Sequence, residues 1–217
     1  MKPCLKYLCL TFPIAAILVL LSILFFDRGV AYAVQTFYNP SEIKENARLG
    51  IYLTYCSYCA MLPVMAGYYF FRLEGYEKTK FMRFIRQLSL SFVFAYFIKD
   101  ILQFFFGRTT VLDYATGKLN FHIHPGRYGF HFFSLGADSF PSGHMTLICA
   151  AMLSVILFYP KLKIPSILLV MLMLIALLLN NFHFLGDTIA GAYLGTSIAL
   201  GVYYIGVYKN ETQKTDK

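Results

Sequence analysis

Long apolar segments recur along almost the whole chain, and this recurrence constrains the fold more than any other feature of the sequence. Crossing the ~30 Å hydrocarbon core of a bilayer takes about 20 helical residues. Six segments reach or approach that length: residues 8–26, 49–71, 88–106, 145–159, 166–184 and 188–208. Hydrophobic residues make up 58% of the chain and charged residues 14%, which excludes an ordinary soluble domain. We therefore predict an all-α polytopic membrane protein with six transmembrane helices.

Positive charge is distributed unevenly between the predicted loops. Lys and Arg fall about twice as often on the loops that share a side with the N-terminus, and the largest group is Arg72, Lys78, Lys80, Arg83 and Arg86. The positive-inside rule then places both termini in the cytoplasm and the long loop of residues 107–140 outside. Because the net charge of +8 is concentrated on these loops, we attribute it to topology and anionic headgroups and expect no nucleic-acid partner.

Domain organisation is simple by the same reasoning. Residues 1–217 form a single predicted transmembrane domain, and residues 209–217 form a polar cytoplasmic tail. The first apolar segment is too long for a signal-peptide core, so we expect a retained anchor. The spacing of Cys56 and Cys59 is that of a redox pair, but two small apolar residues on a membrane helix are the better interpretation.

One short motif, Pro141-Ser142-Gly143-His144, precedes the fourth apolar segment. Ser142 is a good helix N-cap, and the residues after it continue as an apolar helix. The first-turn N–H groups of such a helix are unpaired donors at its positive end, and glycine lets a phosphate oxygen approach them closely. We therefore predict a phosphate cradle at Ser142 and Gly143, with His144 above it as a proton donor.

A second pair of residues, His183 and Asp187, follows one membrane span later. Residues four apart share one face of a helix, so the carboxylate of Asp187 can hold one imidazole nitrogen of His183 and leave the other free to attack. The motifs place these residues and the cradle at shared ends of predicted helices 3 to 6, and the charge distribution places those ends on the extracytoplasmic side.

These motifs resemble the second and third motifs of the type 2 phosphatidic acid phosphatase superfamily, and the resemblance covers residues 99–195. It implies a phosphatase in which His183 attacks phosphorus and forms a phosphohistidine, Asp187 orients the imidazole, and His144 first protonates the leaving oxygen and then activates water. The catalytic residues implied are therefore His144, His183 and Asp187. No metal and no cofactor are needed in that scheme.

The chain departs from the superfamily pattern at its cationic positions. Leu177 occupies the place of the third-motif Arg, and anchoring the first motif on Arg108 places Gln103 where the pattern has Lys. The phosphate-binding residues that we expect are Lys99, Arg108, Ser142 and Gly143, with Arg108 as the principal cation and Lys99 as a lesser one. A charged residue within a membrane segment is costly, which makes Lys99 a functional candidate.

The resemblance also implies the substrate class and location. We expect a membrane lipid headgroup of the outer leaflet as substrate, such as lipid A phosphate, a polyprenyl diphosphate, phosphatidate or phosphatidylglycerol phosphate, in a bacterial inner membrane with the site facing the periplasm. Two alternatives stay open at this stage. One is a lipid phosphotransferase, and the other is a non-catalytic lipid-binding or transport protein on the same fold.

Overall fold

The computed structural model describes residues 3–37, 79–111, 129–133 and 139–215, together with six isolated residues between 52 and 69. The described chain is helical, which confirms the all-α class. Its long helices are α1 (Pro3–Leu21), α2 (Asp27–Phe37), α4 (Lys80–Phe106), α6 (Gly143–Phe158), α7 (Lys163–Leu179) and α8 (Leu185–Thr215). Two short elements complete the set, a π-helical turn η1 (Ser22–Phe26) between α1 and α2 and a 3₁₀ turn η3 (Pro160–Leu162) before α7.

Four described segments have the length and hydropathy of membrane spans, namely Lys6–Thr36, Lys80–Phe106, Pro160–Leu179 and Leu185–Gly206. A fifth, α6, is apolar but shorter. The structure therefore supports a membrane protein with several apolar helices. It does not establish the predicted number of six, because most of the predicted span 49–71 lies outside the described residues.

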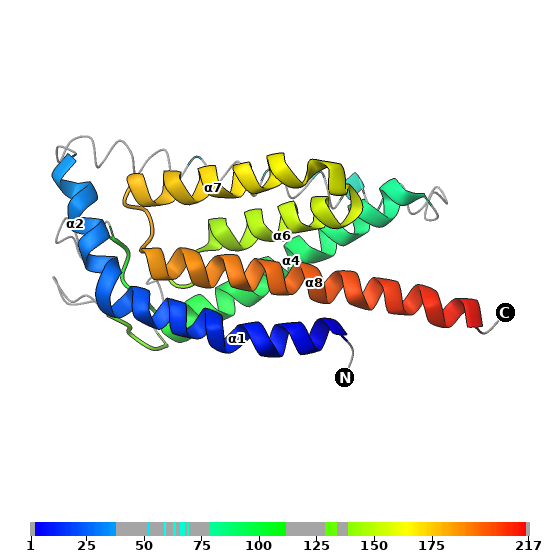
Figure 1. Ribbon diagram of the computed structural model, residues 1–217, viewed down its shortest axis with the longest axis horizontal. Coiled ribbons are helices and arrows are strands. Elements are labelled where there is room, and N and C mark those ends of the chain that lie inside the picture. The colour runs from blue at the N-terminus through cyan, green and yellow to red at the C-terminus, as the bar shows by residue number, and fades with distance from the viewer. Residues whose placement is uncertain are drawn as a thin grey trace.

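The N-terminal helix extends well beyond its predicted end. Apolar character alone indicated a span over residues 8–26, with Asp27 just outside it. In the structure the π-helical turn carries the chain directly from α1 into α2, which continues to Phe37. Figure 1 shows that α2 turns away from the line of α1 at this point. Asp27 is buried at the junction, because its carboxylate has partners in other segments of the fold.

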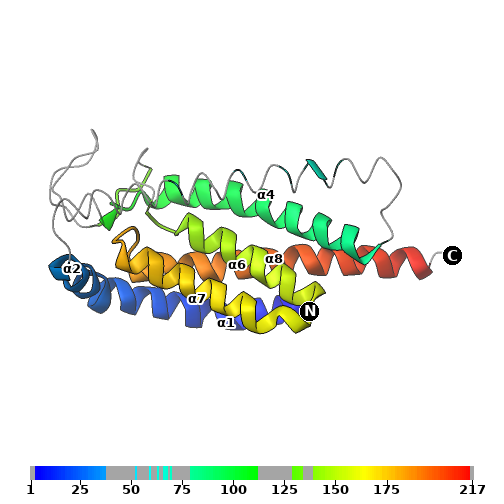
Figure 2. The same cartoon turned by 90° about the horizontal axis from the view of Figure 1, so that it is seen from above.

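Helix α6 lies at the centre of the bundle. It packs against α4, α7 and α8, and α1 lies along the outer side of α8 (Figures 1 and 2). The core between α4, α6 and α8 is built from small and branched residues, among them Ala95, Ala150 and Ile198. Between α6 and α7, Met145 and Cys149 pack against Leu177. Burial of these apolar faces fixes where the N-terminal end of α6 sits relative to its neighbours.

Two glycines let α6 and α8 approach at backbone distance. A Cβ on Gly191 would lie 2.4 Å from the carbonyl oxygen of Ser142, and one on Gly195 would lie 2.1 Å from that of Thr146. No side chain fits in that space, so glycine at this four-residue spacing is a packing requirement, as it is at many helix contacts in membranes. The contact fixes the beginning of α8 beside the N-terminal end of α6.

One end of the bundle therefore collects the C-terminal end of α4, the N-terminal end of α6 and the turn between α7 and α8. This end lies on the left in Figures 1 and 2, next to α2. The described chain termini lie toward the other end (Figure 1). The relative placement agrees with the predicted topology, in which the two motifs share the side opposite the termini. Which side of a membrane each end faces stays a prediction.

Candidate active site

The N-terminal end of α6 carries the motif Pro141-Ser142-Gly143-His144, as predicted. Ser142 is the N-cap, and its hydroxyl oxygen accepts a hydrogen bond from the backbone N–H of Met145 at 3.4 Å. The backbone N–H of Ser142 donates to the carbonyl oxygen of Asp187 at 3.0 Å, which joins the two motifs directly. Ser142 is fully buried. Gly143 and His144 supply the first-turn N–H groups.

Lys99 lies directly over this cradle. A Cβ built on Gly143 would be 2.9 Å from Cδ and 3.1 Å from Cε of Lys99, and 3.8 Å from its Nζ. The ammonium group is buried, contacts the carboxylate of Asp100, and donates to Oε1 of Gln103 at 3.2 Å. Lys99 thus brings positive charge to the positive end of α6. We expected Arg108 to be the nearer cation, and the structure places Lys99 there instead.

Gln103 ties α4 to the loop before α6. Its amide nitrogen donates to the carbonyl oxygen of Pro141 at 3.0 Å, while its amide oxygen accepts from Lys99. Both ends of this side chain are used in holding Lys99 beside the cradle. Gln103 stands one turn after Lys99 on the same helix, so the two act from one face of α4.

His183 does not lie on a helix, which corrects the prediction that His183 and Asp187 share a helical face. Helix α7 ends at Leu179 and α8 begins at Leu185, and Asn181 adopts a positive φ of 49° in the turn between them. The amide of Asn181 also donates to the carbonyl oxygen of Ala31 in α2, at 3.3 Å. His183 is therefore presented by a turn that is anchored to the N-terminal helix.

The imidazole of His183 is oriented mainly by a backbone carbonyl. Its Nδ1 lies 3.1 Å from the carbonyl oxygen of Ser139 and 3.8 Å from Oδ2 of Asp187. Because a carbonyl oxygen only accepts hydrogen bonds, Nδ1 must carry the proton in this contact. In neutral His183 the lone pair is then on Nε2. The nearest group to Nδ1 is thus the backbone carbonyl of Ser139, which sequence reasoning missed. Asp187 lies further from Nδ1.

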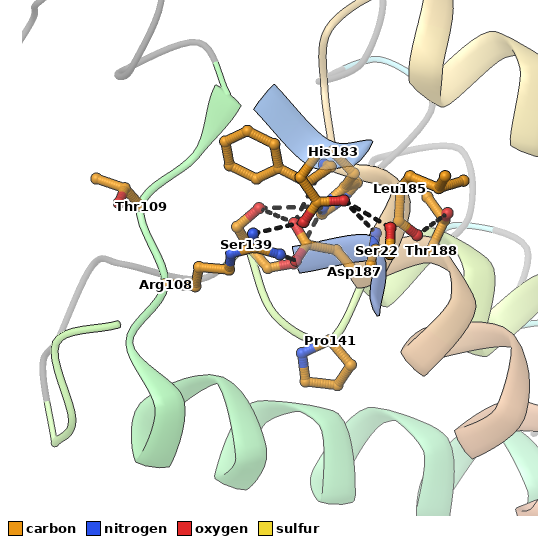
Figure 3. Close-up of polar contacts among 12 residues, drawn as sticks. Ser22, Arg108, Thr109, Ser139, Pro141, His183, Leu185, Asp187 and Thr188 are labelled. Atoms are coloured by element: carbon orange, nitrogen blue, oxygen red, sulfur yellow. Dashed lines mark hydrogen bonds and ion pairs between the residues drawn. The ribbon is translucent and has the colours of Figure 1, made fainter. Parts of the chain in front are cut away.

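Asp187 holds several parts of the site together (Figure 3). Its Oδ2 accepts hydrogen bonds from the hydroxyl of Ser139 and from the backbone N–H of Phe184, the latter at 3.2 Å. The Phe184 bond caps the first turn of α8 in the manner of a capping box. Its Oδ1 forms an ion pair with Nη1 of Arg108. Each of these contacts fixes the carboxylate next to His183.

Arg108 is fully buried, and its role as a phosphate clamp stays a prediction. Its Nη1 pairs with Asp187 and its Nη2 pairs with Asp27 of α2 at 2.6 Å, and the side chains of all three residues have no exposed surface. The guanidinium also lies 5.1 Å from the ring centre of Phe130 and 4.4 Å from that of Phe184. Both terminal nitrogens of Arg108 are paired with carboxylates in this structure.

The two histidines of the prediction come together. The ring centres of His144 and His183 are 5.9 Å apart, and both rings contact Phe182 edge-on.

Among the described residues, no group of three His, Cys, Asp or Glu side chains is arranged to hold a metal ion. His122, His124 and Arg127, in the long loop of residues 107–140, lie outside the described residues. His131 is described, and its backbone N–H donates to the carbonyl oxygen of Gly107 at 2.9 Å.

The sequence was compared with models of protein families, and the model of the PAP2 superfamily matches residues 84–211. That segment is more than half of the chain and includes both motifs. The chain belongs to the PAP2 superfamily. The resemblance to type 2 phosphatidic acid phosphatases is thereby confirmed at the level of the superfamily.

A solved structure of a PAP2 protein shares the fold. The crystal structure of a transmembrane PAP2-type phosphatidylglycerolphosphate phosphatase from Bacillus subtilis superimposes with a TM-score of 0.52, over 92% of this chain and 94% of that one. Only 17% of the residues are identical, so the match establishes the fold alone. No curated protein matched the sequence.

The PAP2 pattern has an Arg where this chain has Leu177, and the structure shows what surrounds that position. Leu177 is 1% exposed and packs against Met145 and Cys149 of α6. At this position the chain has an apolar contact between α6 and α7, where the pattern has a cation. The basic side chain that lies nearest to Gly143 of the cradle is Lys99.

Proposed function

We propose that this PAP2 protein is a metal-independent lipid phosphatase that works through a phosphohistidine on His183. The observation that carries the proposal is the contact between His183 Nδ1 and the Ser139 carbonyl, which leaves the lone pair of neutral His183 on Nε2, in a ring whose centre is 5.9 Å from that of His144. A protein that only binds lipid has no use for such a nucleophile. Membership of the PAP2 superfamily supports a phosphatase over a carrier on the same fold.

The proposed reaction has two steps. In the first, Nε2 of His183 attacks the phosphorus of a headgroup phosphate, the N–P bond forms, and the P–O bond to the lipid breaks as His144 donates a proton to the leaving oxygen. In the second, His144 takes a proton from water, the water oxygen bonds to phosphorus, and the N–P bond breaks to release phosphate. Asp187 stabilises the positive charge of the imidazole in both steps.

Charge on the transferred phosphoryl group has to be balanced in the transition state. We assign this role to the ammonium group of Lys99 and to the first-turn N–H groups of Gly143 and His144, which form one cradle in the structure. Ser142 caps the helix and so holds those N–H groups in place. Arg108 acts indirectly, through Asp187.

The proposed substrate is a phosphomonoester or diphosphate on a lipid headgroup, because the site lies at the ends of apolar helices, within reach of a headgroup. The proposed location is the periplasmic face of a bacterial inner membrane, which rests on the distribution of Lys and Arg. A phosphotransferase that passes the phosphoryl group to a second lipid is the alternative, because the same intermediate serves both reactions.

The test is phosphate release by purified protein in detergent micelles, with EDTA present. The panel contains phosphatidate, phosphatidylglycerol phosphate, lipid A and undecaprenyl diphosphate, and the matched control is His183→Ala. We expect release from at least one lipid by the native protein and none by the variant. Release by both proteins at the same rate would refute the mechanism, and consumption of lipid phosphate without free phosphate would favour the transferase.

A further inference from the structure

A carboxylate from outside the segment that matches the PAP2 family reaches into the site. Asp27 is the first residue of α2 and is 1% exposed. Its Oδ1 accepts hydrogen bonds from the Ser22 hydroxyl and from the backbone N–H of Gly186, both at 2.8 Å, and its Oδ2 accepts from Arg108 at 2.6 Å. Asp27 is thus held by the π-helical turn and itself holds both Arg108 and the first turn of α8.

The approach of α8 to Asp27 depends on the residue at position 186. A Cβ on Gly186 would lie 3.0 Å from Oδ2 of Asp27 and 3.1 Å from Cγ1 of Ile23. Glycine allows the N-terminal end of α8 to rest against the carboxylate, where a negative charge is favourable. Asp187, the next residue, is positioned by the same turn. Asp27 of α2 therefore contacts the site directly, through its bonds to Gly186 and Arg108.

The net charge of the buried cluster of Asp27, Arg108 and Asp187 sets the electrostatic potential at His183. Arg108 alone would neutralise Asp187, leaving a closed ion pair with little negative potential for His183. Asp27 shares the same guanidinium, so the three ionised groups together carry a net charge of minus one, with no exposed side-chain surface. Oδ2 of Asp187, which faces His183 Nδ1 at 3.8 Å, is the outer edge of that cluster. In a buried site such a charge is screened weakly.

We propose that Asp27 is a positioning residue for phosphoryl transfer. It shares Arg108 with Asp187 and so keeps negative charge next to His183 when the imidazole becomes positive. The proposal rests on the proposed function of His183 as nucleophile. It adds to that function a requirement from the N-terminal helix, which the family motifs do not contain.

Asp27→Asn tests this with a side chain of the same shape. The amide oxygen of Asn can still accept from Ser22 and Gly186, so the hydrogen bonds of the helix junction are kept, while the negative charge and the acceptor for Nη2 of Arg108 are both removed. We expect kcat to fall about tenfold with KM changed less than about twofold, because the lost interaction matters most in the transition state. The matched control is Thr36→Val on α2, whose exposed hydroxyl, within the described ranges, bonds the carbonyl oxygen of Ala33.

A double-variant cycle with Arg108→Gln asks whether Asp27 acts through Arg108. Without the guanidinium, two carboxylates are left together, so removing the charge of Asp27 should no longer be harmful. We expect Asp27→Asn to cost nothing, or to restore activity, in the Arg108→Gln background. A purely structural role would give the same fold-loss in both backgrounds, and that result would overturn the proposal. Thermal unfolding of each variant in detergent identifies any that does not fold.

A second readout does not need activity. In protein labelled with ¹⁵N-histidine, the Nδ1 resonance of His183 reports the charge beside it, and His183→Gln assigns the signal. We expect Asp27→Asn to move this resonance and Thr36→Val to leave it in place. An unmoved resonance overturns the proposal. If the native protein hydrolyses no lipid of the panel but the resonance moves, the positioning by Asp27 stands and the proposed function is what fails.

Discussion

The close contact between Gly143 and Lys99 makes a sharp prediction about Gly143→Ala. The added Cβ would lie 2.9 Å from Cδ of Lys99, whereas two carbon atoms prefer about 3.5–4.0 Å. The Lys99 side chain must then move away from the cradle by roughly 0.5–1 Å. A misplacement of about 1 Å in a catalytic site can cost about 100-fold in rate, which corresponds to ~2.7 kcal/mol in the activation free energy.

The assay is kcat/KM for phosphate release from a lipid substrate, with Gly201→Ala as the matched control. A Cβ on Gly201 meets no atom of the described residues within 4 Å, so that variant should keep full activity and gain up to about 1 kcal/mol of helix stability. Lys99→Ala supplies the second background, because it removes the atoms with which the new methyl group collides. If Gly143→Ala costs the same factor with Lys99 present and absent, displacement of Lys99 is not the cause and the reasoning is refuted.

Three further outcomes are expected. Asp187→Asn should lower kcat on the order of 100-fold, because the charge beside the imidazole is lost, and an unchanged kcat would exclude the role that we assign to this carboxylate. Gly191→Ala should lower the free energy of unfolding by about 1–3 kcal/mol, because its Cβ meets a backbone oxygen that cannot move aside; a thermal melt unchanged in detergent would contradict this packing. In protein without native cysteines, an impermeant thiol reagent added to intact cells should label Phe132→Cys at the site end and spare Lys161→Cys at the opposite end, and the reverse pattern would place the site in the cytoplasm.

Much of the fold could be predicted because apolar length and helix capping are local properties. Ser142 was recognised as an N-cap from its own residue type and the apolar run after it, and the structure confirms the cap. The end of the fifth span was placed too late, at residue 184, although Asn180 and Asn181 form a signal for a break. Asn tolerates the positive φ that Asn181 adopts, so this pair could have located the turn that presents His183.

The parts that sequence reasoning missed depend on partners far apart in the chain. Asp27 was placed outside the first span because a charge ends an apolar run. It is nevertheless buried, because its carboxylate pairs with Arg108, which lies 81 residues further along the chain. Arg108 was assigned to phosphate because its two carboxylate partners are far from it in the sequence. Ser139 orients His183 through a backbone carbonyl, which no residue-type pattern can indicate.

The register of the first motif was likewise a question of geometry. Anchoring on Arg108 made Gln103 the equivalent of the expected Lys and gave Lys99 a minor role. The structure shows Gln103 bonded to Pro141 and to Lys99, with the Lys99 side chain against Gly143. Spacing along α4 is set by the helix, but which turn faces the cradle is set by how α4 packs on α6.

The central claim is that His183 carries the phosphoryl group, and direct detection of a phosphoenzyme tests it. Purified protein is mixed with a lipid bearing a ³²P-labelled headgroup phosphate and quenched in alkali, where phosphohistidine is stable. The His144→Ala variant is included because it lacks the base for the hydrolytic step and should accumulate the intermediate. We expect alkali-stable, acid-labile label on a peptide containing His183 and none in His183→Ala. Label on another residue, or equal label in His183→Ala, would contradict the account.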